Sequence, residues 1–222
     1  MKKLYLLSLA LILCPGEIFS LPACNSSVEL SSCSGSEKWA NGERYSGEYK
    51  NGKRTGQGIY TWPNAEKYKG DFVDGIISGQ GTYTWPNGNI YIGDFINGIK
   101  AGKGLSTWPN GNRYEGDYLD GKRHGKGKYR WSGGDEYTGD FIDGKITGKG
   151  THTWPNGNRY EGDYLDGKRH GNGLYNWPNG DFYQGSFIND FRGGEGTFTF
   201  ADGTIQSGLF QNNIYFGTLN RK

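Results

Sequence analysis

The sequence has few of the residues on which most enzymes and metal sites depend. It holds three histidines and three cysteines in 222 residues. Its formal net charge of +2 is too small for a global field that concentrates nucleic acid or anionic membranes. It contains no nucleophile elbow, no phosphate-binding glycine loop and no metal-ligand spacing. These absences predict that the protein is not an enzyme, holds no cofactor or metal and binds no nucleic acid.

Long apolar runs are also missing. The N-terminal run from Leu4 to Cys14 follows Lys2 and Lys3, and it is too short to span a bilayer comfortably. Its flanks fit a secretory signal peptide with cleavage after Ser20. We therefore expect residues 1–20 to be a signal peptide and the protein to be exported, either secreted, periplasmic or associated with the cell envelope.

Two cysteines, Cys24 and Cys33, remain after this cleavage in a predicted polar linker, residues 21–36. In an exported protein they could form a small disulfide loop. The segment Leu21-Pro22-Ala23-Cys24 also resembles a bacterial lipobox, in which Cys24 would be acylated and Cys33 left free. The sequence leaves both alternatives open, a disulfide or a lipoprotein.

Glycine and aromatic residues are abundant instead, and they recur with a fixed period. The chain has 40 glycines and is 15 % aromatic, a combination that argues against disorder. The stretch Thr107–Gly125 is repeated letter for letter at Thr153–Gly171. Tyrosines recur every 23 residues, which marks a repeat architecture: Tyr45, Tyr68, Tyr91, Tyr114, Tyr137, Tyr160 and Tyr183.

Each repeat predicts one β-hairpin. If the recurring tyrosine is position 1, glycines follow at positions 3, 8, 12 and 14, an aromatic at 5 and tryptophan at 18. Residues alternate within two stretches, which predicts two strands, and turns such as Asp120-Gly121 separate them. We predict an all-β fold for residues 37–217, an elongated single-layer antiparallel β-meander of about seven to eight hairpins. Residues 218–222 would form a charged tail.

Glycines and aromatic residues are expected to share one face of this sheet. If Gly70 lies opposite Gly81, the next turn brings Phe95 near Gly81 and Tyr83 near Gly93. Rings would then lie over bare backbone.

The pattern Y-x-G-[DE]-[YF]-x-[ND]-G-x-x-x-G-x-G resembles the MORN repeat (membrane occupation and recognition nexus), including the pair His124-Gly125. The resemblance covers Trp39 to about Gly217, and with the leader it suggests an exported bacterial-type member. It implies tethering and scaffolding near membranes.

Two functions remain open. The first is a non-enzymatic exported scaffold or protein-interaction module that binds a protein partner or a second copy of itself, with membrane association as an extension. The alternative is a carbohydrate or cell-wall binding array whose exposed aromatic rings stack on sugars. Rings shielded by neighbouring rings would exclude that alternative, and the rings to inspect are Trp85, Trp108, Trp154 and Trp177.

Basic residues at positions 9 to 11 are the candidate contacts for anionic phospholipid or a partner, because ammonium and guanidinium groups bind phosphate. They are Arg54, Lys122, Arg123, His124, Lys145, Lys168, Arg169 and His170. The alternative is that these charged turn residues only keep the protein soluble. Ile76 and Ile77 interrupt the basic series, which favours this alternative. His124 and His170 lie two repeats apart, roughly 19 Å, which excludes a shared metal ion.

Overall fold

The computed structural model describes residues 21, 23–24 and 32–218. The predicted signal peptide and residues 219–222 of the predicted tail lie outside them. Within the described residues every regular element is a β-strand.

Seventeen strands follow one another along the described chain. They are β1 (Cys33–Lys38), β2 (Arg44–Lys50), β3 (Lys53–Thr61), β4 (Lys67–Val73), β5 (Ile76–Thr84), β6 (Ile90–Ile96), β7 (Ile99–Thr107), β8 (Arg113–Leu119), β9 (Lys122–Arg130), β10 (Glu136–Ile142), β11 (Lys145–Thr153), β12 (Arg159–Leu165), β13 (Lys168–Asn176), β14 (Phe182–Ile188), β15 (Phe191–Thr199), β16 (Ile205–Gln211) and β17 (Ile214–Gly217).

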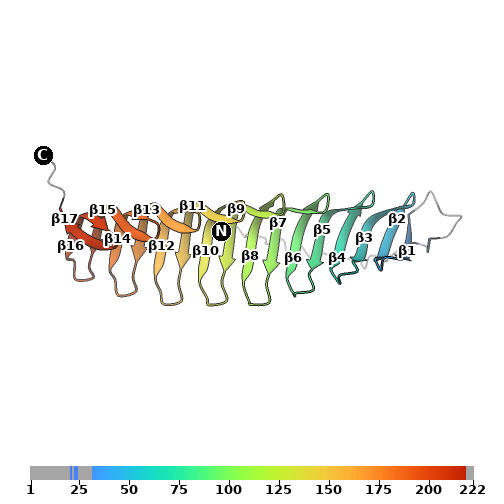
Figure 1. The fold of residues 1–222 in the computed structure, drawn as a ribbon, viewed down its shortest axis with the longest axis horizontal. Helices are drawn as coiled ribbons and strands as arrows, with labels where there is room; N and C mark the ends of the chain where they lie inside the picture. Colours follow the sequence, from blue (N-terminus) through green and yellow to red (C-terminus); the bar gives the residue numbers. More distant parts are fainter. Residues whose placement is uncertain (1–20, 22, 25–31, 219–222) are drawn as a thin grey trace, which may run out of the picture.

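Each strand pairs antiparallel with the next one in the sequence, from β1–β2 to β16–β17. The result is one long, single-layer sheet with β1 at one end and β17 at the other (Figure 1). The predicted elongated β-meander is confirmed.

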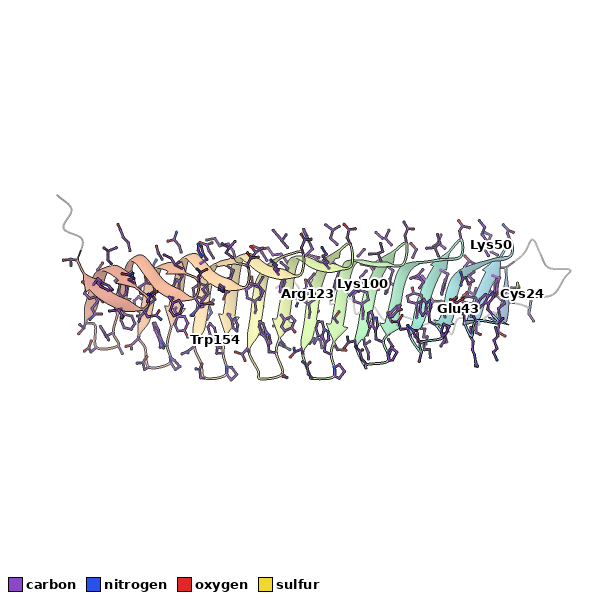
Figure 2. All side chains as sticks on the ribbon, in the orientation of Figure 1. Cys24, Glu43, Lys50, Lys100, Arg123 and Trp154 are labelled. Atoms are coloured by element: carbon purple, nitrogen blue, oxygen red, sulfur yellow. A yellow bond between two sulfur atoms is a disulfide. The ribbon has the colours of Figure 1, made fainter. Side chains whose placement is uncertain are left out.

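Two kinds of connection define the two long borders of the sheet. At the tight-turn border, Asp120 and Gly121 both have positive φ, as a two-residue hairpin turn requires. At the loop border, the amide of Gly111 donates to the carbonyl of Trp108 at 2.9 Å and so closes the Pro-Asn-Gly loop. Figure 2 shows Lys50 at the tight-turn border and Trp154 near the loop border.

The core is a row of aromatic rings on one face of the sheet, which we call the aromatic face. The recurring tyrosines, from Tyr45 to Tyr183, are at most 1 % exposed. Tyr114, for example, lies edge to face with Tyr118 at 5.3 Å and with Phe141 of the next repeat at 5.0 Å. Its hydroxyl donates to the carbonyl of Asp117 at 2.9 Å. Each ring therefore packs against its own hairpin and the next, and these contacts join the repeats into one array.

Glycines let these tyrosines lie flat on the backbone. Gly116 pairs with Gly127, and a Cβ atom added to Gly127 would lie 2.5 Å from Cε2 of Tyr114. Only a residue without a side chain fits beneath the ring.

The predicted register is right at one pair and wrong at two. Gly70 lies opposite Gly81 as expected, but Phe95 pairs with Gly79, and Tyr83 pairs with Tyr91. The cause is the loop between β5 and β6, where the amide of Trp85 donates to the carbonyl of Asn89 and Thr84 pairs with Ile90, so the register differs by two residues from the expected one. A separate β-bulge within each hairpin, such as that between Gly70 and Phe72, shifts the pairing of β4 with β5 next to the tight turn. The ring that covers Gly70 and Gly81 is Tyr68 of the same hairpin.

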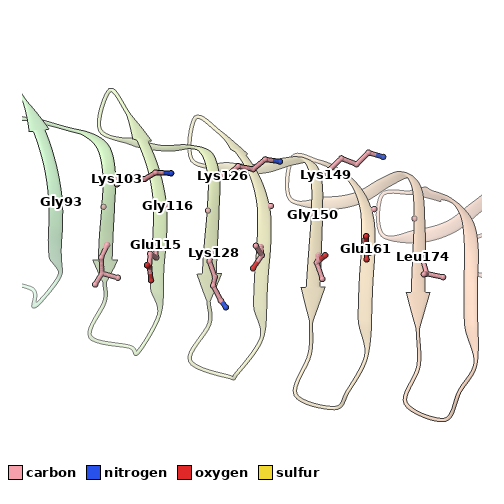
Figure 3. A pocket seen from close by; sticks show the side chains of 18 of the residues that line it. Gly93, Lys103, Glu115, Gly116, Lys126, Lys128, Lys149, Gly150, Glu161 and Leu174 are labelled. Carbon is pink, nitrogen blue, oxygen red and sulfur yellow. The ribbon is translucent and has the colours of Figure 1, made fainter. Parts of the chain in front are cut away.

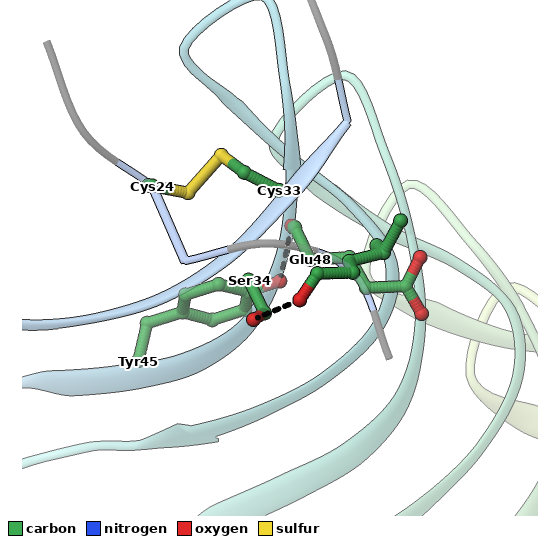
Figure 4. Close-up of a disulfide and its surroundings, with 6 residues drawn as sticks. Cys24, Cys33, Ser34, Tyr45 and Glu48 are labelled. Atoms are coloured by element: carbon green, nitrogen blue, oxygen red, sulfur yellow. Dashed lines mark hydrogen bonds between the residues drawn. A yellow bond between two sulfur atoms is a disulfide. The ribbon is translucent and has the colours of Figure 1, made fainter. Parts of the chain in front are cut away.

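The first edge of the sheet is capped by a disulfide. Cys24 and Cys33 are joined by a disulfide bond (Figure 4), and the amide of Cys24 donates to the carbonyl of Ser34 at 2.9 Å. The predicted linker 21–36 is therefore wrong from Cys33 onward, because these residues pair with β2 and cover its edge. Of the two alternatives for the cysteines, the structure contains the disulfide. Acylation of Cys24 would require that this disulfide bond be broken, because the same sulfur atom carries the lipid.

Candidate interaction surfaces

A long groove runs along the outer face, which is the face opposite the buried tyrosines. It has a volume of about 1620 Å³ and extends from Gln80 in β5 to Gly185 in β14. Its floor consists of the paired glycines of successive hairpins, such as Gly116 and Gly127, and two rows of side chains form its walls (Figure 3). The groove thus follows the repeat axis and offers bare backbone between two rows of side chains.

The first wall is a ladder of lysines and aspartates. Lys126 lies 2.5 Å from Asp140 of the next repeat, Lys149 lies equally close to Asp163, and Lys103 contacts Asp117. The second carboxylate oxygen of Asp117 accepts the amide of Lys126 at 3.0 Å. Each aspartate thus closes the bulge of its own hairpin and binds the preceding repeat, a structural role.

The pKa of the Asp117 carboxyl is lowered, first by the hydrogen bond from Lys103 and also by the amide of Lys126. Burial acts in the opposite direction. The ladder therefore stays charged at neutral pH.

The second wall mixes paired charges with apolar residues. Glu115 is 2.9 Å from Arg113, and Lys128 is 2.7 Å from Glu136. Leu105 and Leu174 lie in the same row. Charges of both signs alternate along the groove and have partners within the sheet.

The predicted basic contact residues do not form one stripe, because the structure divides them between the two faces. Lys122 and Lys145 are exposed at the tight-turn border, where they face Asp143 at 3.8 Å and Asp166 at 2.8 Å. Lys168 occupies the equivalent exposed place.

The arginines of the series lie on the aromatic face instead. The guanidinium groups of Arg54, Arg123 and Arg169 sit 5.0 to 5.9 Å from the ring centres beneath them. Arg123 also donates to the carbonyl of Gly144 at 2.6 Å, and Arg169 binds Asp190. These three side chains therefore pack within the array and are poorly placed to reach a flat membrane.

The histidines of the series are partly buried. The Nδ1 atoms of His124 and His170 are covered and have no hydrogen-bond partner among the described residues. Each lies beside the bulge of its hairpin.

Sequence reasoning missed an apolar row on the outer face at the tight-turn border. Its side chains are 48 % to 60 % exposed and flank successive turns. They are Val73, Ile76, Ile96, Ile99, Leu119, Ile142, Leu165, Ile188 and Phe191. The alternation of residues along the strands did indicate that positions 6 and 9 point to the outer face. Outward positions are usually polar, so an apolar row was not expected there. We call these residues the border row.

Most tryptophan rings pack against the rings of neighbouring strands. Trp154 lies between His152 at 4.1 Å and Tyr175 at 5.6 Å. Trp177 lies between Tyr175 and Phe198. Trp85 packs against Tyr83, and Trp108 packs against Tyr129, both with tilted rings. The rings therefore do not stand free in a row.

Within the described residues, no three His, Cys, Asp or Glu side chains gather in a way that could hold a metal ion. The same part of the chain has no helix that is long and apolar enough to cross a membrane.

An open β-meander of near-identical hairpins, with a ring core on one face and a groove on the other, defines an elongated repeat protein. The MORN repeat family model matches residues 45–65, 68–90, 91–113, 114–136, 137–159, 160–182 and 183–205. The chain belongs to the MORN-repeat family, and its repeats make it an interaction module.

Several solved structures are similar to this chain at low identity. One is the TCP domain of SAS-4 (dCPAP) of Drosophila melanogaster in complex with a proline-rich motif of Ana2 (dSTIL). It is 15 % identical, with 75 % of this chain and 96 % of that chain covered and a TM-score of 0.45. Another is the TCP10 domain of Danio rerio CPAP in complex with a STIL peptide, with 13 % identity, 82 % and 98 % coverage and a TM-score of 0.31. No curated protein matches the chain.

Proposed function

We propose that the protein is an exported, non-enzymatic scaffold that binds an extended segment of a partner protein in the groove of its outer face. The observation that carries this proposal is the groove itself, which runs past five repeats over a floor without side chains. A partner chain can approach such a floor closely.

The walls suggest what the segment looks like. Lysines occupy equivalent places in three successive hairpins, at Lys103, Lys126 and Lys149, and two strand spacings are about 10 Å. Three residues of extended chain cover about the same distance. A segment in the polyproline II conformation, in which every third side chain lies on the same side, would therefore meet these lysines if it had an acidic residue at every third position.

Export is supported by the predicted signal peptide and by the Cys24–Cys33 disulfide, since disulfides persist in oxidising compartments. The carbohydrate alternative has less support, because most of the tryptophan faces that it needs are packed against other rings.

The groove can be tested with substitutions that the array itself already contains. Gln57 and Gln80 occupy the lysine place of the ladder in the first two repeats and bind Asp71 and Asp94. The triple variant Lys103→Gln, Lys126→Gln and Lys149→Gln should therefore fold normally. We expect it to bind the partner about tenfold more weakly than the wild type, because it loses three charge-assisted contacts.

The matched control changes three lysines at the tight-turn border, namely Lys122→Gln, Lys145→Gln and Lys168→Gln. A partner is first captured on the mature wild-type protein by cross-linking in its native compartment, and its affinity for each purified variant is then measured by calorimetry. Equal weakening by the groove and border variants would contradict a binding site in the groove.

Membrane association is a second candidate, which the border row favours. Half-exposed Ile and Leu side chains alternate there with Lys122, Lys145 and Lys168, a combination that suits the interface of an anionic bilayer. We expect the mature protein to sediment weakly with phosphatidylserine-containing vesicles and to be released at high salt. The border variant should lose this binding and the groove variant should keep it. Equal sedimentation with neutral phosphatidylcholine vesicles would exclude a role for the lysines.

A further inference from the structure

Asparagine followed by glycine recurs in the turns and loops of the sheet. Asparagine is one of the chemically labile residues, and a glycine after it leaves the main-chain nitrogen without a shielding side chain. That nitrogen can attack the asparagine side chain once it has lost its proton, so a hydrogen bond that holds the proton slows the reaction. The asparagines concerned are Asn41, Asn51, Asn87, Asn97, Asn110, Asn156 and Asn179.

The asparagines of the loop border are held by two hydrogen bonds in each loop. In the loop after β5, the amide of Gly88 donates to the carbonyl of Trp85 at 2.9 Å, and the side-chain oxygen of Asn87 accepts the amide of Asn89 at 3.0 Å. Both reacting groups are therefore engaged. The same two bonds recur around Asn41, Asn110, Asn156 and Asn179.

The tight turns have one such bond, and its acceptor belongs to the preceding hairpin. In the turn between β6 and β7, the amide of Gly98 donates to the carbonyl of Ile77 at 2.8 Å. The glycine after Asn97 is therefore protected by a neighbouring repeat. The same bond recurs in other tight turns, with the donors Gly75, Gly121, Gly144 and Gly167.

The first tight turn, between β2 and β3, lacks this protection. The strand β1 pairs with β2 from Cys33 to Lys38, but it offers no carbonyl to this turn. Within the described part of the chain, the amide of Gly52 donates no hydrogen bond, and the side chain of Asn51 makes none. Both residues are exposed. Figure 2 shows Lys50, which precedes this pair, near one end of the sheet.

We propose that Asn51 is a site of spontaneous covalent modification, with water as the second reactant. The nitrogen of Gly52 gives its proton to a solvent base and forms a bond to Cγ of Asn51. The side-chain nitrogen takes up a proton and leaves as ammonia. Water then opens the resulting succinimide ring: hydrolysis at Cγ gives aspartate, and hydrolysis at the main-chain carbonyl carbon gives isoaspartate.

The two products differ in how they fit the turn. Isoaspartate has one more carbon atom in the main chain and no longer fits a two-residue turn. Aspartate should leave the hairpin intact, because it already stands at the equivalent place of other tight turns with nearly the same positive φ. These turns contain Asp74, Asp120, Asp143 and Asp166. Both products add a negative charge beside Lys50 and Lys53.

Asn97 is the internal control, because its turn has almost the same backbone. The φ angles are 51° at Asn51 and 50° at Asn97, and 73° at Gly52 and 79° at Gly98. The mature full chain is incubated in mildly alkaline buffer, and peptide mapping by mass spectrometry follows each asparagine, with electron-transfer fragmentation to distinguish the two products. We expect Asn51 to react at least about fivefold faster than Asn97, since Gly98 must first lose its hydrogen bond.

Two further measurements separate the fold from the flanking residues. In concentrated urea the turns lose their hydrogen bonds, so Asn51 and Asn97 should react at similar rates. The variant Asp120→Asn places the tripeptide Asn-Gly-Lys of the first turn in a turn whose glycine, Gly121, donates to the carbonyl of Lys100 at 2.9 Å. In the folded protein, the asparagine introduced there should react as slowly as Asn97. The variant Asn51→Asp is itself one product and should keep the wild-type melting temperature.

Equal rates at Asn51 and Asn97 in the folded protein would overturn the proposal. A difference that persists in urea would overturn it too, because it would assign the faster reaction to the flanking residues. A fast reaction in Asp120→Asn would show that the hydrogen bond to the preceding hairpin gives no protection. None of these outcomes depends on a partner or on the groove.

Discussion

Gly81→Ala is expected to destabilise the sheet by about 3 kcal/mol, at the upper end of the usual range for overpacking. The new Cβ atom would lie 2.5 Å from Cζ of Tyr68. That ring cannot move aside, because it is buried between Phe72 at 5.3 Å and Phe95 at 5.2 Å. Urea unfolding monitored by circular dichroism gives the loss, and hydrogen exchange shows whether it is centred on β4 to β6.

The matched control is Gly133→Ala, in a loop at the loop border. Neither glycine has a positive φ, so neither substitution strains the backbone, and the two differ mainly in the space available. A Cβ atom at Gly133 would meet only Asp135 Oδ2, at 3.3 Å, and we expect a change within about 0.5 kcal/mol. A comparable loss in the two variants would show that the general effect of adding a methyl group, and not the ring, sets the cost.

The sequence predicted the fold well because every repeat must meet the same packing requirement. A buried tyrosine needs glycine beneath it in both strands of its hairpin, so the spacing of Tyr114, Gly116 and Gly127 fixes the pairing of β8 with β9. The bulge was harder to foresee. It depends on a positive φ at a position-12 glycine such as Gly125 and on a carboxylate, here that of Asp117, that binds the amide beyond it. Alternation alone contains neither signal.

The surfaces were predicted less well, because adjacent turn residues alternate between the two faces of the sheet, whereas the prediction grouped positions 9 to 11 along one border. Lys122 and Arg123 are adjacent in sequence and were grouped as one basic patch, yet the lysine faces solvent and the arginine lies over Tyr129 at 5.1 Å. Ser106 stands where every other repeat has Tyr, His or Phe, and the structure buries it, with its hydroxyl 2.6 Å from that of Tyr118.

Tyr114→Ala is expected to cost about 4 kcal/mol, in the range for aromatic-to-alanine changes in a core. The ring is fully buried and contacts Tyr118 in its own hairpin and Phe141 in the next, so its loss breaks the contact between two repeats as well as the packing within one. Because each hairpin is held mainly by its neighbours, hydrogen exchange should become faster on both sides of the site, from β7 to β10. Tyr114→Phe removes only the hydrogen bond to Asp117 and should cost about 1 kcal/mol. Equal losses in the two variants would assign the stability to that hydrogen bond and contradict a core built from ring packing.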